Sequence, residues 1–136
     1  MIYFKEHYAT VRYDEELKMV EVEWHGLVLS NHYRETLNMV LDLINEKKLE
    51  RFLVNRKNME RISLSDERWR EEDWYPRFLK SSLKRSASII SKDYYNEVSV
   101  SRLIEEKDKK LHIERRRFYN YKEAKEWLLQ DVKVEK

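Results

Sequence analysis

The start of the chain alternates apolar and charged positions in a way that predicts an antiparallel hairpin. From Val20 to Trp24 every second side chain is apolar, and the two between them are glutamates. This pattern is typical of a strand with one buried and one solvated face. The hairpin is predicted to comprise strands at residues 8–13 and 17–24, joined by a polar turn at residues 14–16.

Helical periodicity replaces this alternation after Gly26, the only glycine of the chain. Apolar residues recur at spacings of three and four behind Ser30, which predicts an amphipathic helix that Ser30 caps. The apolar positions of this helix are Tyr33, Leu37, Val40, Leu41 and Ile44.

Two further helix starts are predicted by capping boxes, in which a capping side chain is followed three residues later by an acid. Ser63 with Asp66 begins one helix, and Asn120 with Glu123 begins the last helix. Apolar runs predict strands at residues 49–54, 87–90 and 111–118, a helical or turn segment at residues 91–106, and a frayed tail at residues 131–136.

Strands that alternate with helices after an opening hairpin predict an α/β fold. We expect a mixed, largely parallel sheet of about five strands with about four packed helices. No linker or internal repeat interrupts the pattern, so residues 1–136 are expected to form a single domain.

Residues 69–80, WREEDWYPRFLK, combine two of the four tryptophans with the only proline. At about 100° per residue, Trp69 and Trp74 fall on opposite edges of the apolar helix face. Pro76 removes one helical hydrogen bond and obstructs the carbonyl four residues back, which predicts a kink or a fresh helix start near Tyr75. Both tryptophans then either pack in the core and at its rim or, with Tyr75, edge an apolar groove used for binding.

Composition adds a heavily charged surface without an overall field. Charged residues make up 40% of the chain, and 28 basic against 26 acidic residues leave a net charge of +2. Any attraction to nucleic acid must therefore be local. Cysteine is absent, which excludes disulfides and thiolate sites and fits a reducing cytoplasm. No apolar run approaches the roughly 18 residues of a membrane span, so we expect a soluble cytoplasmic protein.

Reactive residue types are present without a recognisable arrangement. The four histidines, at positions 7, 25, 32 and 112, have no HExxH spacing, and one glycine is too few for a phosphate-cradling loop. No GxSxG turn occurs. We therefore predict no catalytic residues, no metal ligands and no cofactor, and a protein that is not an enzyme.

Residues 107–117, KDKKLHIERRR, carry six basic and two acidic side chains. In a strand, Arg115 and Arg117 face one way and Arg116 faces the other. This arrangement favours a sheet edge protected by charge. An edge that binds RNA or phosphate, with two nearby tyrosines available for stacking, is the alternative.

Four segments together carry a family resemblance: YDEELKMVEVEWHG, LVNRKNM, the serine-headed helix with Trp69, and FYNYKEAKEWL. In this order of strands and helices, residues 8–129 resemble the STAS-like domains related to bacterial anti-sigma-factor antagonists. More closely, they resemble the small stand-alone bacterial branch, SpoIIAA-like, that is often grouped with CRAL-TRIO lipid-transfer folds.

The resemblance implies a non-enzymatic binding or regulatory module with a curved mixed sheet. In the antagonists a serine at the start of the helix after the third strand is phosphorylated. Ser63 and Ser65 occupy the corresponding region here, although the family's Asp-Ser-Gly type signature is absent. A phosphate there would lie in the favourable field of a helix N-terminus, whereas the alternative is that Ser63 only caps the helix.

We expect a protein partner to dock on the junction (residues 55–66) and on the aromatic helix at residues 69–78. The alternative is a carrier of a small apolar or lipid-like ligand held between that helix and the sheet. Nucleic-acid binding through residues 107–117 is less favoured, and the charged strand and aromatic helix could form a two-fold contact in a homodimer. The predicted partner or ligand surface comprises Asn55, Arg56, Asn58, Ser63, Ser65, Trp69, Trp74 and Tyr75.

Overall fold

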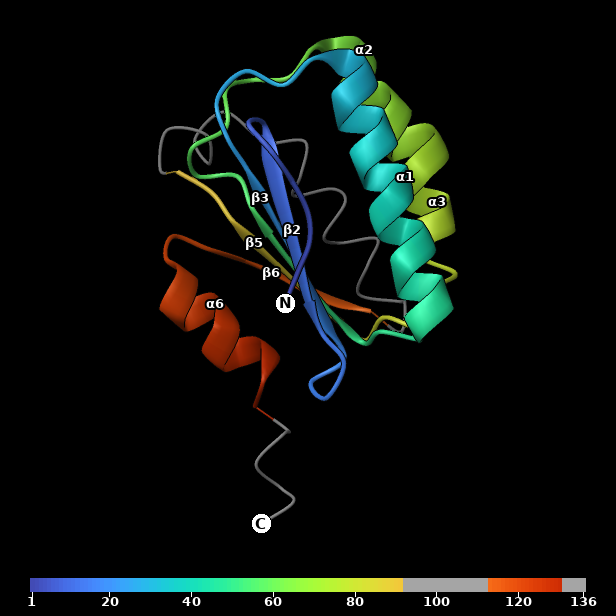
Figure 1. Cartoon of the computed structure of the whole chain (residues 1–136), viewed down its shortest axis with the longest axis vertical. Coiled ribbons are helices and arrows are strands. Elements are labelled where there is room, and N and C mark those ends of the chain that lie inside the picture. The colour runs from blue at the N-terminus through green and yellow to red at the C-terminus, as the bar shows by residue number, and fades with distance from the viewer. Residues whose placement is uncertain (92–112, 131–136) are drawn as a thin grey trace.

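A computed structural model describes residues 1–91 and 113–130, and Figure 1 shows a twisted sheet with helices on both faces. Within this part of the chain six strands pair in sequence order. The first strand pairs antiparallel with the second and the second with the third, whereas the third to the sixth strands run parallel to one another. The strands are β1 (Ile2–Glu6), β2 (Ala9–Asp14), β3 (Met19–Trp24), β4 (Arg51–Asn55), β5 (Arg85–Ile89) and β6 (Glu114–Phe118). The predicted mixed, largely parallel sheet is confirmed.

Helices cover the sheet from two sides. The long α1 (Ser30–Lys47) lies beside a bent rod on one face, and α6 (Tyr121–Leu128) lies on the other (Figure 1). The bent rod consists of α2 (Leu64–Trp69), the π-helical turn η1 (Arg70–Trp74) and α3 (Tyr75–Phe78). Apart from Ser91, the helical or turn segment predicted at residues 91–106 lies outside the described residues, as does the predicted tail at 131–136.

The face under α1 and the bent rod holds the larger core. Val20, Val22 and Trp24 of β3, which alternate with the glutamates, point into it. The apolar face of α1 packs onto these strands, and the five apolar helix positions predicted from the sequence are all buried. Burying an aliphatic or aromatic side chain of this size stabilises the fold by about 1.5 to 3 kcal/mol, so this layer is the main source of stability.

The opposite face of the sheet holds a smaller core under α6. Met19, Leu53, Ala87 and Ile89 pack there against Ala124, Trp127 and Leu128. Strands β3, β4 and β5 therefore contribute buried side chains to both faces of the sheet.

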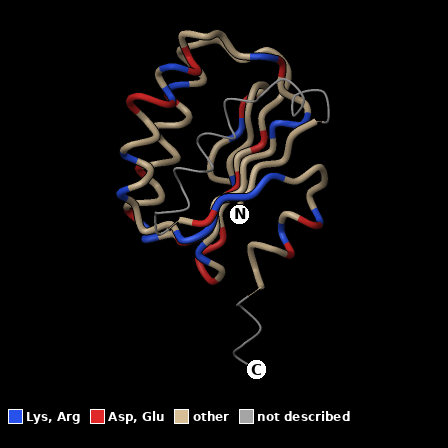
Figure 2. The backbone as a smooth tube through the Cα atoms, turned by 180° about the vertical axis from the view of Figure 1, so that it is seen from behind, with Lys and Arg blue, Asp and Glu red and all other residues tan. Residues whose placement is uncertain are grey.

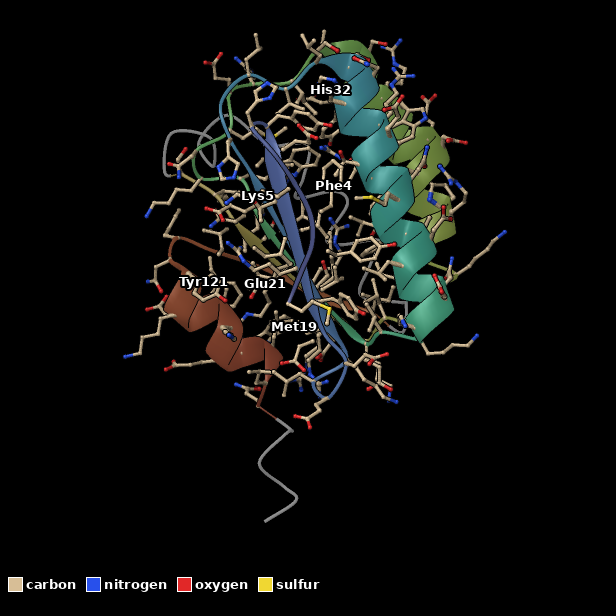
Figure 3. All side chains as sticks on the ribbon, viewed as in Figure 1. Phe4, Lys5, Met19, Glu21, His32 and Tyr121 are labelled. Atoms are coloured by element: carbon tan, nitrogen blue, oxygen red, sulfur yellow. The ribbon has the colours of Figure 1, made fainter. Side chains whose placement is uncertain are left out.

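The prediction that one face of the hairpin is exposed to solvent is partly wrong. Glu21 is only 8% exposed, because α6 begins beside it and the Tyr121 hydroxyl donates a hydrogen bond to its carboxylate. Figure 3 shows the two side chains next to one another. Glu23 does meet the expectation in part, since it is half-buried and accepts from Arg12.

The N-terminal strand β1 was not predicted. Its five residues are mostly exposed, and its register against β2 shifts between Ile2 and Phe4. A strand whose two faces are both largely solvated has no alternation of buried and exposed positions to predict it. This strand accounts for the sixth member of a sheet that was expected to have about five.

Two of the three predicted helix caps are confirmed. Ser63 Oγ accepts from the backbone N–H of Asp66 at 3.1 Å, and Asn120 Oδ1 accepts from that of Glu123 at 2.8 Å. The Ser30 cap is wrong: Leu29 occupies the capping position, and no side chain caps that helix.

Candidate functional site

The junction runs beside the loop that follows β3, at the end of the sheet formed by the C-terminal ends of the parallel strands. The N–H of Gly26 donates to the carbonyl of Asn58 at 2.8 Å, and the N–H of Glu60 donates to the carbonyl of Gly26 at 2.9 Å. Gly26 has a φ of +62°, in the left-handed region that favours glycine. Both connections pass side by side over this edge before entering α1 and α2 (Figure 1).

Asp66 fixes the two helix starts to one another. Asp66 is 2% exposed, and its carboxylate accepts from Ser30 Oγ at 2.6 Å and Arg34 Nε at 2.9 Å. Burial alone would raise the pKa of Asp66, but hydrogen bonds from Ser30, Arg34 and Ser63 outweigh it and hold the pKa below its ordinary value. Arg34 Nη2 also donates to Ser65 Oγ at 3.1 Å.

Sequence reasoning did not place Ser30, Arg34 and Asp66 together. Asp66 was recognised only as part of a capping box, which is a local signal. Its partners lie more than 30 positions away on α1, and no spacing rule connects residues that far apart. Ser30, Arg34 and Asp66 belong to the site because they hold the loop after β3 and the junction at a fixed distance from each other.

Three leucines are exposed at the same edge. Leu27 and Leu29 are 63% and 55% exposed, and Leu64, at the start of α2, is 75% exposed. Val28 between the first two is buried in the core, so the extended backbone turns its neighbours outward. Leu29 and Leu64 flank the hydrogen bond between the helix starts, and we call these three residues the leucine patch. They were missed because apolar residues in a connecting segment do not reveal their exposure.

Trp74 is packed inside the protein. It is 4% exposed, its indole N–H donates to the carbonyl of Leu37 at 2.8 Å, and its ring stacks on Phe78. Of the predicted kink or fresh helix start near Tyr75, the fresh start is confirmed, since the π-helical turn η1 ends at Trp74 and a new α-helical turn begins at Tyr75. The wider π-helical turn accommodates the ring of Pro76, which would otherwise clash with the carbonyl four residues before it.

The other two aromatic candidates lie at the rim of the core. Trp69 is half-buried, with its ring edge-to-face against Tyr33 and the Arg34 guanidinium 5.3 Å from its centroid. Tyr75 is half-buried, with Arg115 of β6 lying 4.6 Å above its ring and donating to its hydroxyl. The two tryptophans therefore differ in burial, with Trp74 inside the core and Trp69 at its rim.

The polar candidates spread along the junction. Asn55 Oδ1 accepts from the N–H of Lys57 at 3.1 Å, a local turn that ends β4. The N–H of Arg56 donates to the carbonyl of Ile89 at 2.8 Å, so the junction starts against the end of β5. Asn58 is exposed, as are Ser63 and Ser65. All of the predicted surface residues except the three aromatic ones therefore belong to one continuous edge.

A cavity of about 360 Å³ lies between the bent rod and the sheet. Trp74 and Tyr75 line it, and Trp69 is not among its described walls. Its apolar wall includes Trp24, Leu37, Phe52, Val54 and Phe78, and its polar wall includes Ser86, Ser88, Arg115 and Arg117. The described residues therefore leave a partly open pocket beneath the aromatic helix.

The charged strand β6 stands at one edge of the sheet within the described residues. Figure 2 shows its three arginines as a continuous blue stretch. The predicted alternation is confirmed for the first two: Arg115 reaches Tyr75 on one face, whereas Arg116 lies over Phe118 and Trp127 on the other. Residues 107–112 of the basic segment lie outside the described residues, so nucleic-acid binding there stays a prediction.

The described residues hold no group of three histidines or carboxylates placed to bind a metal ion. Among these same residues, no helix has both the length and the apolar character needed to cross a membrane.

Comparison with known proteins defines the fold. A scan against protein-family models finds no match, and a search of curated proteins finds no relative. Among solved structures, the chain is similar to an uncharacterized protein of the DUF3478 family from Shewanella loihica PV-4, which is described as having a SpoIIAA-like fold. The two are 14% identical, with a TM-score of 0.63, over 93% of this chain and 98% of that chain. The fold is therefore SpoIIAA-like, as the resemblance to STAS-like domains predicted.

Proposed function

We propose that this protein is a non-enzymatic, STAS-like binding module that engages a protein partner through the junction and the leucine patch. The observation that carries this proposal is the exposure of three leucines on two cross-linked connections. A leucine left in water forgoes about 1.5 to 3 kcal/mol that burial would release, so a partner that covers all three gains substantial affinity. Contiguous exposed apolar residues mark interaction sites, and these three leucines lie on connections that are hydrogen-bonded to each other.

The surroundings of the leucine patch support a specific contact. Asn58, Ser63 and Ser65 are exposed beside it and supply hydrogen-bonding groups, the arrangement of an apolar centre with a polar rim. The buried Asp66 clamp holds both connections in place before binding, which lowers the entropy lost when a partner docks. The aromatic helix contributes rigidity through Trp74 rather than exposed area.

The test is a pull-down from the native host lysate with two matched variants. Leu27→Lys places a charge in the leucine patch without touching the cavity, and Ile2→Lys makes the same change at an exposed apolar position on β1. We expect the wild type and Ile2→Lys to recover the same partner and Leu27→Lys to recover at least tenfold less. Equal recovery by all three proteins would refute the proposed surface.

Modification of Ser65 or Ser63 would act on the same surface. Ser65 Oγ already lies 3.1 Å from Arg34 Nη2, so a phosphate on Ser65 would meet a guanidinium and add charge beside the leucine patch. Phosphorylation at this position is therefore proposed as a way of weakening an apolar contact.

A second candidate function is carriage of a small ligand, and the cavity under the bent rod favours it. A volume of about 360 Å³ lies within the usual range of about 300 to 1,000 Å³ for small-molecule sites. Native mass spectrometry of freshly purified protein tests this function: a co-purifying molecule supports a carrier, and a mass equal to that of the bare chain counts against it.

A further inference from the structure

We propose that the protein partner presents an acidic side chain among apolar ones, so that its carboxylate pairs with Arg34 while the apolar side chains cover the leucine patch. This inference rests on the proposed function and names the chemistry of the partner. It comes from the ion pair between Arg34 and Asp66, whose two members differ sharply in exposure.

The ion pair turns its positive member outward. The side chain of Arg34 is 34% exposed, whereas that of Asp66 is 3% exposed. A partner that docks beside the leucine patch therefore meets the guanidinium, while the carboxylate that neutralises it stays inside the protein. Contact with a carboxylate is favourable at such a surface, and contact with a second cation is not.

The guanidinium of Arg34 has donors to spare. Its Nε donates to Asp66 Oδ1 at 2.9 Å, and its Nη2 donates to Ser65 Oγ at 3.1 Å. Within the described residues, Nη1 makes no hydrogen bond. An arginine carries more N–H donors than these contacts use, so the N–H groups of Nη1 can donate to a carboxylate of the partner.

Two neighbours hold this guanidinium in place before a partner arrives. Asp66 binds one edge of it, and the ring of Trp69 lies with its centroid 5.3 Å from the central carbon. Trp69 itself packs edge-to-face against Tyr33 of α1. A guanidinium that is already ordered loses little conformational entropy when it pairs, so its contact with a carboxylate is more favourable than that of a free surface arginine.

Two of the three leucines adjoin this cluster. Leu29 directly precedes Ser30, whose hydroxyl binds the same carboxylate oxygen as Arg34. Leu64 directly precedes Ser65, whose hydroxyl accepts from Arg34. A single segment of a partner can therefore reach the apolar and the charged part of the surface together. The apolar contacts would supply most of the affinity, and the carboxylate would fix the orientation of the segment.

The test uses the protein to select its own peptides. A phage library of random peptides is panned on the immobilised full chain, and peptides that also bind Leu27→Lys are removed, so that the survivors bind the leucine patch. One surviving peptide, and the same peptide with each acid replaced by its amide, are then titrated by calorimetry into the wild type, Arg34→Gln and Arg77→Gln. Arg77 is the matched control, because it also pairs with an aspartate but lies on α3, away from the helix starts.

We expect acidic residues to be enriched in the surviving peptides relative to the starting library. Replacing the acids by amides should weaken binding to the wild type and to Arg77→Gln by about tenfold, which exceeds the contribution of a fully exposed ion pair. The same replacement should change binding to Arg34→Gln less than twofold.

Peptides that bind the leucine patch without enriched acids would overturn the acidic partner and leave the proposed function standing. Equal weakening in Arg34→Gln and the wild type would also overturn it, because the carboxylate would then pair elsewhere. If no peptide distinguished the wild type from Leu27→Lys, the proposed function would fail as well. Sedimentation with phosphatidylglycerol vesicles that is lost in Leu27→Lys would assign the leucine patch to a lipid surface and would likewise overturn the proposal.

A measurement on the wild type alone covers the case in which Arg34→Gln does not fold. The indole N–H signals in a nitrogen–proton NMR spectrum report each tryptophan separately. At saturation, the acidic peptide should shift the signal of Trp69, which lies against Arg34, more than its amide form does, and both peptides should leave Trp127 under α6 unchanged. Equal shifts of the Trp69 signal with the two peptides would contradict the contact with Arg34.

Discussion

Replacing Asp66 with asparagine tests how strongly the two helix starts are tied together. The substitution preserves the shape of the side chain and removes its charge. Hydrogen bonds to a charged group contribute about 1.5 to 3 kcal/mol each, and breaking a fully buried ion pair costs about 3 to 5 kcal/mol. The side chain of Arg34 is 34% exposed and can return to water, and asparagine retains one acceptor. We therefore expect Asp66→Asn to lower the free energy of unfolding by about 2 kcal/mol.

Urea unfolding at neutral pH measures this loss, and Asp73→Asn is the control. Asp73 also pairs with an arginine, Arg77, but its side chain is 59% exposed. Exposed ion pairs of this kind contribute about 0 to 1 kcal/mol, so the control should remain close to the wild type. The reasoning would be refuted if the two variants had the same stability at pH 7.

The pH dependence of the difference has a definite sign. The pKa of Asp66 is lowered in the folded protein, so its contribution to stability is present above the ordinary aspartate pKa of about 3.9 and is lost as the pH falls through the folded value. The gap between the wild type and Asp66→Asn should therefore be full at pH 7 and shrink below about pH 4. A gap that widened on acidification would contradict the assignment of Asp66 as a buried carboxylate.

Two further predictions concern single residues. Gly26→Ala should lower the free energy of unfolding by about 1 to 2 kcal/mol in a urea titration, because the left-handed φ of +62° is unfavourable for alanine. Steric clash does not contribute, since an added Cβ meets no neighbouring side chain or backbone within 4 Å. An unchanged stability would show that the backbone conformation at this position carries no cost. Burial and the hydrogen bond to Glu21 raise the pKa of Tyr121. A titration followed by ultraviolet absorbance should therefore show one phenol that ionises above the ordinary pKa of about 10. This signal should be absent in Tyr121→Phe. The stability that Tyr121 contributes should decline as the pH rises above about 10, and a normal titration of that phenol would show that the contact does not form.

Features with local causes could be predicted from the sequence. The caps at Ser63 and Asn120 depend on a backbone N–H three residues away, and the new helical turn at Tyr75 depends on the adjacent Pro76. In each case the residues that determine the geometry are neighbours in the chain. The mixed sheet followed from the same local signals taken in order, because strands alternating with helices have few ways to pack.

Features with distant causes could not be predicted in the same way. Ser30 has the chemistry of a helix cap, but its hydroxyl donates to Asp66, 36 positions away. Glu21 occupies a position that alternation assigns to solvent, yet Tyr121, 100 positions away, covers it. The leucine patch and the polar side of the cavity likewise arise from segments that meet only in the fold.

Hydrogen–deuterium exchange on the complex with the recovered partner tests the central proposal most directly. The account predicts that binding slows exchange in residues 26–30 and 58–66, the two connections that carry the leucine patch, and leaves α6 unchanged. Protection confined to α6 or β1, with the two connections exchanging as in the free protein, would contradict it.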